Sequence, residues 1–72
     1  METKDRLILA DMTVLDVVNR FRGTEAVFRN YDQQAGFCIC CNALFETLTE
    51  LCGRHGIDLH RLLEELEKAA RE

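Results

Sequence analysis

The chain has 72 residues, with thirteen acidic and nine basic side chains and a formal net charge of −4. A chain of this length makes one small domain, residues 1–72, with no room for a second core. Its apolar fraction of 47% is too high for a disordered chain, and its acidic balance gives nucleic-acid binding little electrostatic support.

Residues 1–11 are predicted to be an extended or flexible N-terminal segment. Residues 6–10 within it have a β-like pattern and are expected to lie extended against the body of the protein. The apolar run at 7–10 is too short for a signal peptide and far too short to span a bilayer. We therefore expect a cytoplasmic protein that does not bind membranes.

Two helices are predicted in the first half of the chain. Thr13 can cap the first helix in a capping box with Asp16, and Gly23 ends that helix. Thr24 can cap a second helix that runs through about Tyr31, and residues 32–36 form a loop. Apolar residues at helical spacing form the two buried stripes: Val14, Val17, Val18 and Phe21, then Val27, Phe28 and Tyr31.

Two further helices are predicted in the second half. The third runs from about Cys40 to Arg54, and Asp58 caps the fourth. Their buried stripes are Cys41, Leu44, Phe45, Leu48, Leu51 and Cys52, then Leu59, Leu62, Leu63, Leu66 and Ala70. Four short helices with tight connections predict an all-α fold, a small four-helix orthogonal bundle whose helical core covers residues 12–70.

Three of the four cysteines, Cys38, Cys40 and Cys41, lie within four positions. A C-x-x-C pair at a helix start brings its two Cα atoms within the roughly 4.4–6.8 Å that a disulfide needs. The positive end of the helix dipole there stabilises a thiolate, the reactive species. We expect Cys38, the more exposed thiol, to attack and Cys41 to resolve. Cys40 is an alternative thiol that fits neither role cleanly.

Two other interpretations of the cysteines remain open. Cys38, Cys40 and Cys41 are also an incomplete ligand set for a zinc or iron–sulfur centre, which a second chain or an exogenous ligand would complete. Cys52 lies about 16 Å from Cys41 if both share one helix, too far for the two to bind one metal ion. It continues the apolar stripe of the third helix, so we interpret it as a small buried hydrophobe. The third interpretation is a helical interaction domain with incidental cysteines. The redox pair requires no cofactor.

The remaining titratable residues suggest no complete catalytic site, so enzymatic activity stays open. His55 is expected at a helix C-terminus, where an imidazolium interacts favourably with the dipole. His60 is expected on the surface. Glu46 and Glu50 are expected to form an i,i+4 pair on a solvated helix face.

A wider pattern surrounds the cysteines. It comprises Met12-Thr13-Val14, Val27-Phe28, Gly36, Cys38-x-x-Cys41, Ala43, Glu46-Thr47-Leu48, His55-Gly56-Ile57-Asp58 and Leu62-Leu63. In this pattern residues 12–66 resemble the hybrid-cluster-protein-associated redox disulfide domain, a small domain of unknown function. The chain is also similar to the N-terminal domain of iron–sulfur cluster repair di-iron proteins.

The resemblance implies a helical domain with a redox-active pair, Cys38 and Cys41, and it implies no particular reaction. The pair would exchange electrons with a protein partner or redox donor that the sequence does not name. Two features depart from the family pattern. Cys40 stands where glycine is common, and the loop at 29–35 is a few residues longer, so the working pair of cysteines stays open.

Overall fold

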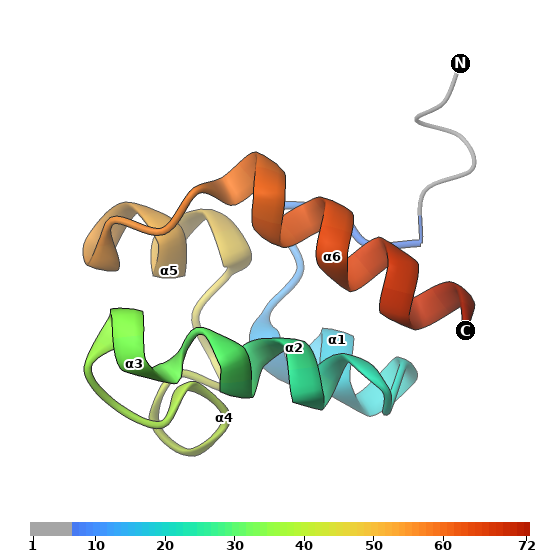
Figure 1. Cartoon of the computed structure of the whole chain (residues 1–72), viewed down its shortest axis with the longest axis horizontal. Coiled ribbons are helices and arrows are strands. Elements are labelled where there is room, and N and C mark those ends of the chain that lie inside the picture. Colours follow the sequence, from blue (N-terminus) through green and yellow to red (C-terminus); the bar gives the residue numbers. More distant parts are fainter. Residues whose placement is uncertain (1–6) are drawn as a thin grey trace.

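The computed structural model describes residues 7–72, which form helices and no strand. The all-α prediction is therefore confirmed, although residues 7–72 form six helices where four were predicted. Figure 1 shows α6 along one side of the molecule, α1 and α2 along the other, and α3 and α4 at the C-terminal end of α2. The helices are α1 (Val14–Arg20), α2 (Thr24–Asn30), α3 (Asp32–Ala35), α4 (Ile39–Asn42), α5 (Leu48–His55) and α6 (Leu59–Arg71). Within residues 7–72, no helix has the length and apolar character needed to cross a membrane.

Helices α1 and α5 begin side by side, each with a capping box. The Thr13 hydroxyl accepts a hydrogen bond from N of Asp16 at 3.1 Å, and the Asp16 carboxylate accepts one from N of Thr13 at 3.3 Å. Thr47 and Glu50 repeat the arrangement at 3.1 and 3.0 Å. An isolated antiparallel bridge joins Thr13 to Thr47. The predicted cap of the first helix is confirmed. The equivalent capping box of Thr47 and Glu50 sets the start of α5.

The single helix predicted from Cys40 to Arg54 is wrong, because the chain forms two helices there. α4 ends where Ala43 leaves the helical region, at φ −124° and ψ 27°. Thr47 is extended and caps α5 afresh. A capping box satisfies backbone amides that a continuous helix would otherwise bond internally, so it marks a new start. Cys41 and Cys52 therefore lie on different helices, and the predicted separation along one helix does not apply.

Smaller differences occur at the ends of α1 to α3. α1 ends at Arg20 with Phe21 as its C-cap, so the prediction that Gly23 ends it is wrong. The segment expected to be a loop contains α3, which Gly36 ends at φ 86°, a conformation that favours glycine. Thr24 is the buried first residue of α2 and donates its hydroxyl to O of Phe21, so it does not cap the helix as predicted. Asp58 caps α6 as predicted and accepts from N of Arg61 at 3.2 Å.

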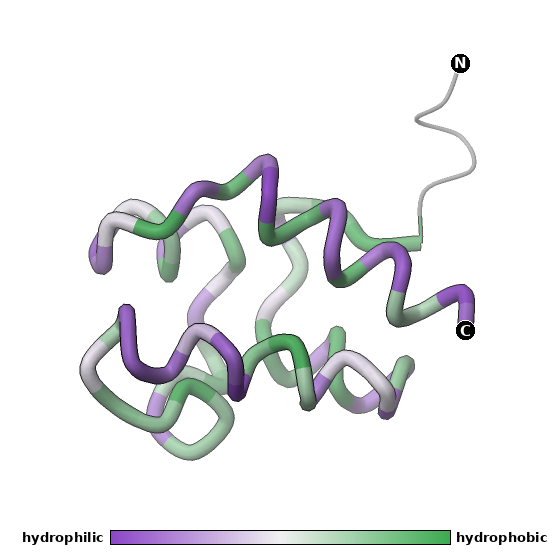
Figure 2. The backbone as a smooth tube through the Cα atoms, viewed as in Figure 1, coloured by the Kyte–Doolittle hydropathy of each residue, from purple (hydrophilic) through white to green (hydrophobic). Residues whose placement is uncertain are grey.

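The core lies between α6 and the other helices. Figure 2 shows hydrophobic residues on the side of α6 that faces α2 and hydrophilic ones on the opposite side. Phe45, expected in the core, is 81% exposed. Seven residues of the predicted stripes are completely buried: Val14, Val17, Phe28, Leu48, Leu51, Leu62 and Leu66.

The N-terminal segment is attached to α6. The amides of Leu7 and Ile8 donate to the Glu67 carboxylate at 2.9 to 3.1 Å, and Ile8 is 1% exposed. The expectation that this segment lies against the body is confirmed for residues 7–10, while residues 1–6 are outside the described part of the chain.

Candidate thiol site

The four cysteines have different surroundings. Cys38 immediately precedes α4 and is half-buried, as is Cys40, whereas Cys41 is exposed. Cys52 is buried in α5, which confirms its predicted place in the core. All four thiols are free. The prediction that Cys38 is more exposed than Cys41 is wrong.

The rotation of α4 explains why Cys41 faces solvent. Ile39 and Ala43, four residues apart on the same face, are 0% and 1% exposed. Successive residues on a helix are rotated by about 100°, so Cys40 and Cys41 turn away from that face. Burying a branched isoleucine removes more apolar surface from water than burying a cysteine, and this difference sets the rotation. The prediction that Cys41 belongs to the buried stripe is wrong, because Ile39 occupies the core-facing position of α4.

Cys38 and Cys41 share one turn of the chain. The Cys38 carbonyl accepts hydrogen bonds from N of Cys41 at 3.2 Å, from N of Asn42 at 3.0 Å and from the Asn42 side chain at 3.2 Å. A hydrogen bond between the two cysteine side chains, together with the charge of Cys38, raises the pKa of Cys41. Cys41 is therefore held in its protonated form more strongly than an ordinary cysteine, and its side chain lies close to that of Cys38.

The helix dipole contributes less than the sequence suggested. α4 has only four residues, and its first amide, N of Ile39, already donates to the Asp32 carboxylate at 3.0 Å. The negative charge of Asp32 also helps to raise the pKa of Cys41, while Arg29 lowers it. Helical spacing does not predict the hydrogen bond to Asp32, because Asp32 lies seven residues before the amide that it binds.

Cys40 faces a different surface from the pair. It lines a groove of about 250 Å³ between α1 and α4. Burial, reinforced by the charge of Glu25, raises the pKa of Cys40 to about 11. At neutral pH this residue is a thiol on the wall of the groove. The other lining residues are Leu15, Val18, Asn19, Arg22 and Glu25.

Within residues 7–72, no group of three or more histidine, cysteine or acidic side chains is placed to hold a metal ion. Cys38 and Cys41 lie close enough to offer two thiolates to one ion, whereas Cys40 turns toward the groove. A metal on this pair would need further ligands from another chain or from solution.

The other titratable candidates have structural surroundings. His55 lies in the last turn of α5 as predicted, and its ring packs on Phe37 with centroids 4.8 Å apart. His60 is exposed and lies 3.1 Å from Glu64. The predicted pairing of Glu46 with Glu50 is wrong: Glu46 precedes α5 and binds Arg54 at 2.8 Å, while Glu50 belongs to the capping box.

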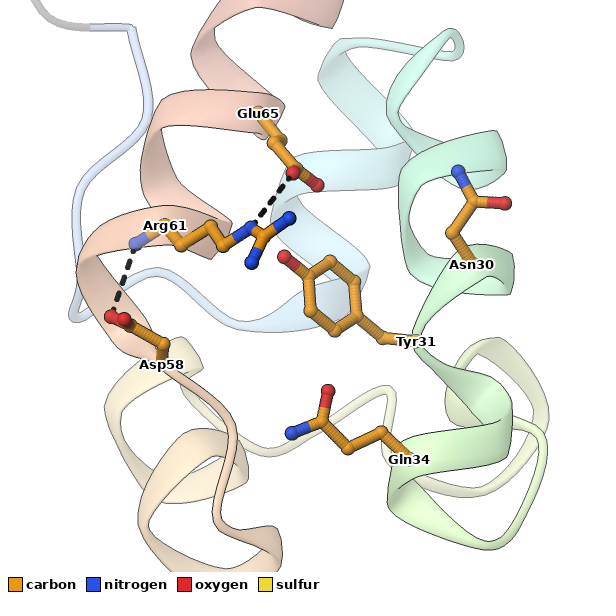
Figure 3. A pocket seen from close by; sticks show the side chains of 6 residues that line it. All are labelled: Asn30, Tyr31, Gln34, Asp58, Arg61 and Glu65. Atoms are coloured by element: carbon orange, nitrogen blue, oxygen red, sulfur yellow. Dashed lines mark hydrogen bonds and ion pairs between the residues drawn. The ribbon is translucent and has the colours of Figure 1, made fainter.

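A second, polar hollow of about 370 Å³ lies between α6 and the α2–α3 junction (Figure 3). Tyr31 points toward Glu65 there, and burial together with a hydrogen bond to Glu65 raises the pKa of Tyr31. Sequence reasoning missed this hollow because its residues are scattered from 30 to 65 with no common spacing. Its lining is Asn30, Tyr31, Gln34, Asp58, Arg61 and Glu65.

Comparisons of the chain with protein-family models, with curated proteins and with solved structures give no match. The resemblance to the hybrid-cluster-associated redox disulfide domain therefore stays a prediction from the sequence.

Proposed function

We propose that this chain is a small cytoplasmic thiol–disulfide exchange domain in which Cys38 attacks and Cys41 resolves. The observation that carries the proposal is the proximity of the Cys38 and Cys41 side chains on one turn of the chain. The raised pKa of Cys41 makes it a poor attacking thiol, because the thiolate is the reactive form, and we therefore assign the attack to Cys38. The resemblance to a redox disulfide domain points to the same pair.

The exchange would proceed in two steps. The Cys38 thiolate attacks one sulfur of a partner disulfide, forming a mixed disulfide while the other partner sulfur leaves with the electron pair of the broken bond. Cys41 then loses its proton to solvent and attacks the Cys38 sulfur, and the second partner sulfur leaves as a thiolate. Two electrons pass from the chain to the partner, which takes up two protons. The chain keeps a Cys38–Cys41 disulfide and needs no cofactor.

The three-residue spacing of Cys38 and Cys41 suits a disulfide after a small adjustment. Side chains three residues apart on a helical turn have Cβ atoms about 5–6 Å apart, and a disulfide needs about 3.5–4.5 Å. Cys38 is extended at φ −76° and ψ 108°, outside the helix proper. Its side chain can therefore approach Cys41 without unwinding α4.

Mapping of disulfides after mild oxidation tests the proposal. The wild-type chain should lose two daltons, mapped by peptide mass spectrometry to Cys38 and Cys41. Cys38→Ser and Cys41→Ser should abolish that loss, whereas the matched control Cys40→Ser should retain it. A disulfide that forms equally well in Cys38→Ser, or that joins Cys40 to either neighbour, would contradict the assignment.

The alternative function is a metal or iron–sulfur module that presents thiolates to a partner or a second chain. The same two adjacent free thiols favour it, since soft thiolate ligands suit zinc and iron–sulfur clusters. Anaerobic purification followed by metal analysis separates the two functions. Stoichiometric zinc or iron that is lost in both Cys38→Ser and Cys41→Ser would favour the metal module over the exchange domain.

A further inference from the structure

The segment that carries Cys38 has no buried residue. Tyr31 and Ile39, at 9% and 0% exposed, are buried on either side of it, whereas all seven residues from 32 to 38 are half-buried or exposed. Helix α3 belongs to this segment and contributes no buried residue to the core. Parts of a chain that bury few side chains open more readily than the core does. The position of Cys38 therefore depends on the contacts that this segment makes with its neighbours.

Two of these contacts reach the C-terminal end of α5. The Phe37 ring packs on the His55 ring with centroids 4.8 Å apart and an interplanar angle of 42°, a separation within the range of favourable aromatic pairs. The Gln34 side chain donates to O of Gly56 at 3.2 Å. Figure 1 shows α3 and the C-terminal end of α5 at the same end of the molecule. Because His55 and Gly56 are consecutive, both contacts hold the segment at one place.

The ring contact acts on the thiol turn because Phe37 directly precedes Cys38. N of Phe37 donates to O of Asp32 at 3.2 Å, and the Asp32 carboxylate accepts from N of Ile39 at 3.0 Å. The residues on both sides of Cys38 are thus tied to the start of α3. Cys41, by contrast, follows Ile39, which lies in the core. The separation of the two thiols therefore depends on how firmly the Phe37 side of the turn is held.

We propose that His55 is a positioning residue of the thiol pair, because its ring holds Phe37 and thereby fixes Cys38 for disulfide closure. The inference rests on the proposed function and identifies a residue that controls the same site. A disulfide to Cys41 requires Cys38 in one place, so a segment that already lies there loses less conformational freedom on closure. Without the ring contact, the reduced chain samples more positions and the disulfide becomes less favourable. In this role His55 acts through Phe37 and transfers no proton.

The equilibrium with glutathione tests the role of His55. The reduced chain and one molecule of oxidised glutathione give the Cys38–Cys41 disulfide and two molecules of reduced glutathione. Two electrons and two protons pass from the chain to glutathione. The oxidised fraction at each ratio of the two glutathione forms is measured by alkylating the free thiols, and peptide mass spectrometry assigns the disulfide to Cys38 and Cys41. The resulting equilibrium constant reports how favourable disulfide closure is.

His55→Ala should lower this equilibrium constant about three- to tenfold, the range that the measured energies of aromatic pairs imply. His55→Phe keeps a ring and should stay within about twofold of the wild type. Phe37→Leu keeps an apolar side chain without a ring and should lower the constant as His55→Ala does. The double variant should lower it no further, because either change removes the same contact. His60→Ala, at an exposed histidine of α6, is the matched control and should change nothing.

Urea denaturation of each reduced variant, followed by circular dichroism, separates positioning from stability alone. A purely structural role would lower the free energy of unfolding in His55→Ala and leave the glutathione equilibrium unchanged, which overturns the positioning role. Additive effects of Phe37→Leu and His55→Ala, or an equal loss in His55→Phe and His55→Ala, would also overturn it and leave the exchange function standing. A wild-type chain that forms no Cys38–Cys41 disulfide at any glutathione ratio would instead overturn the exchange function itself.

Discussion

Cys38, Cys40 and Cys41 lie on one short turn, but they do not share one chemical environment. Cys41 is exposed and hydrogen-bonded to Cys38, whereas Cys40 lines the groove and has a pKa raised to about 11 by burial and by Glu25. The difference arises from the rotation of α4, which Ile39 sets by occupying the core. A thiol buried against apolar walls is stabilised in its neutral form, so it is a poor nucleophile at neutral pH.

Cys40 should therefore be alkylated slowly. At pH 8 a thiol with a pKa of about 11 is roughly 0.1% thiolate, against about a quarter for an ordinary cysteine of pKa about 8.5. The greater intrinsic nucleophilicity of the more basic thiolate recovers part of this difference. In the Cys38→Ser/Cys41→Ser variant, iodoacetamide should label Cys40 about 10- to 20-fold more slowly than a free cysteine peptide.

Peptide mass spectrometry over a pH series measures this rate, which should still be rising at pH 10. Adding Glu25→Gln removes a charge that raises the pKa of Cys40, so the labelling rate should increase. Glu64→Gln, on the exposed face of α6, is the matched control and should change nothing. Labelling of Cys40 as fast as the free peptide at pH 8 would contradict a buried, neutral thiol.

At the scale of the elements, the start of α5 decides where the thiol turn ends. The Thr47 hydroxyl accepts a hydrogen bond from N of Glu50, and the Glu50 carboxylate accepts one from N of Thr47. The bridge between Thr13 and Thr47 holds this start beside α1. Without that cap, the apolar spacing from Cys41 to Cys52 is compatible with one long helix. The sequence does contain the signal, since Thr47-x-x-Glu50 is a capping-box pattern. The apolar spacing continues past this capping box and therefore favoured one long helix over a new helix start.

Thr47→Ala should lower the free energy of unfolding by about 1 kcal/mol, because the amide of Glu50 loses its side-chain acceptor. Urea denaturation followed by circular dichroism measures the loss. Thr47→Ser keeps a hydroxyl in the same place and should stay within about 0.5 kcal/mol of the wild type. Equal destabilisation by the two substitutions would argue against the cap as the cause.

At the scale of the whole molecule, Glu67 on α6 binds the N-terminal segment, which lies sixty positions earlier in the chain. Its carboxylate accepts from N of Leu7 and N of Ile8 and lies 2.9 Å from the Arg71 guanidinium. Burial alone would raise the pKa of Glu67, but the two backbone hydrogen bonds and Arg71 outweigh it and lower that pKa. The folded state therefore holds the carboxylate in its charged form more strongly than the unfolded chain does.

A lowered pKa gives stability that is fully present above the unfolded value, about 4.3 for glutamate, and is lost as the pH falls through the folded value. Glu67→Gln should lower the free energy of unfolding at pH 7 by about 1–2 kcal/mol, since hydrogen bonds to a charged group are replaced by weaker ones. The difference from the wild type should shrink as the pH falls below about 4. Urea denaturation at several pH values measures it.

Glu64→Gln is the control for this measurement, because Glu64 is exposed on the same helix. Its stability should follow that of the wild type from pH 7 to pH 3. A loss in Glu67→Gln that persists unchanged at pH 3 would show that the charge of Glu67 is not what holds the N-terminal segment.

The sequence by itself determined the features that depend on neighbours three or four residues apart. The caps at Thr13 and Asp58, the apolar stripe of α6 and the C-x-x-C turn all follow from that spacing, because helix geometry is local. The tertiary structure alone decided which face of α4 is buried, that Cys40 lines a groove and that Phe45 is exposed. It also brought the Glu67 carboxylate to the backbone amides of Leu7 and Ile8. These features depend on competition among distant side chains for one core, and residue spacing does not encode that competition.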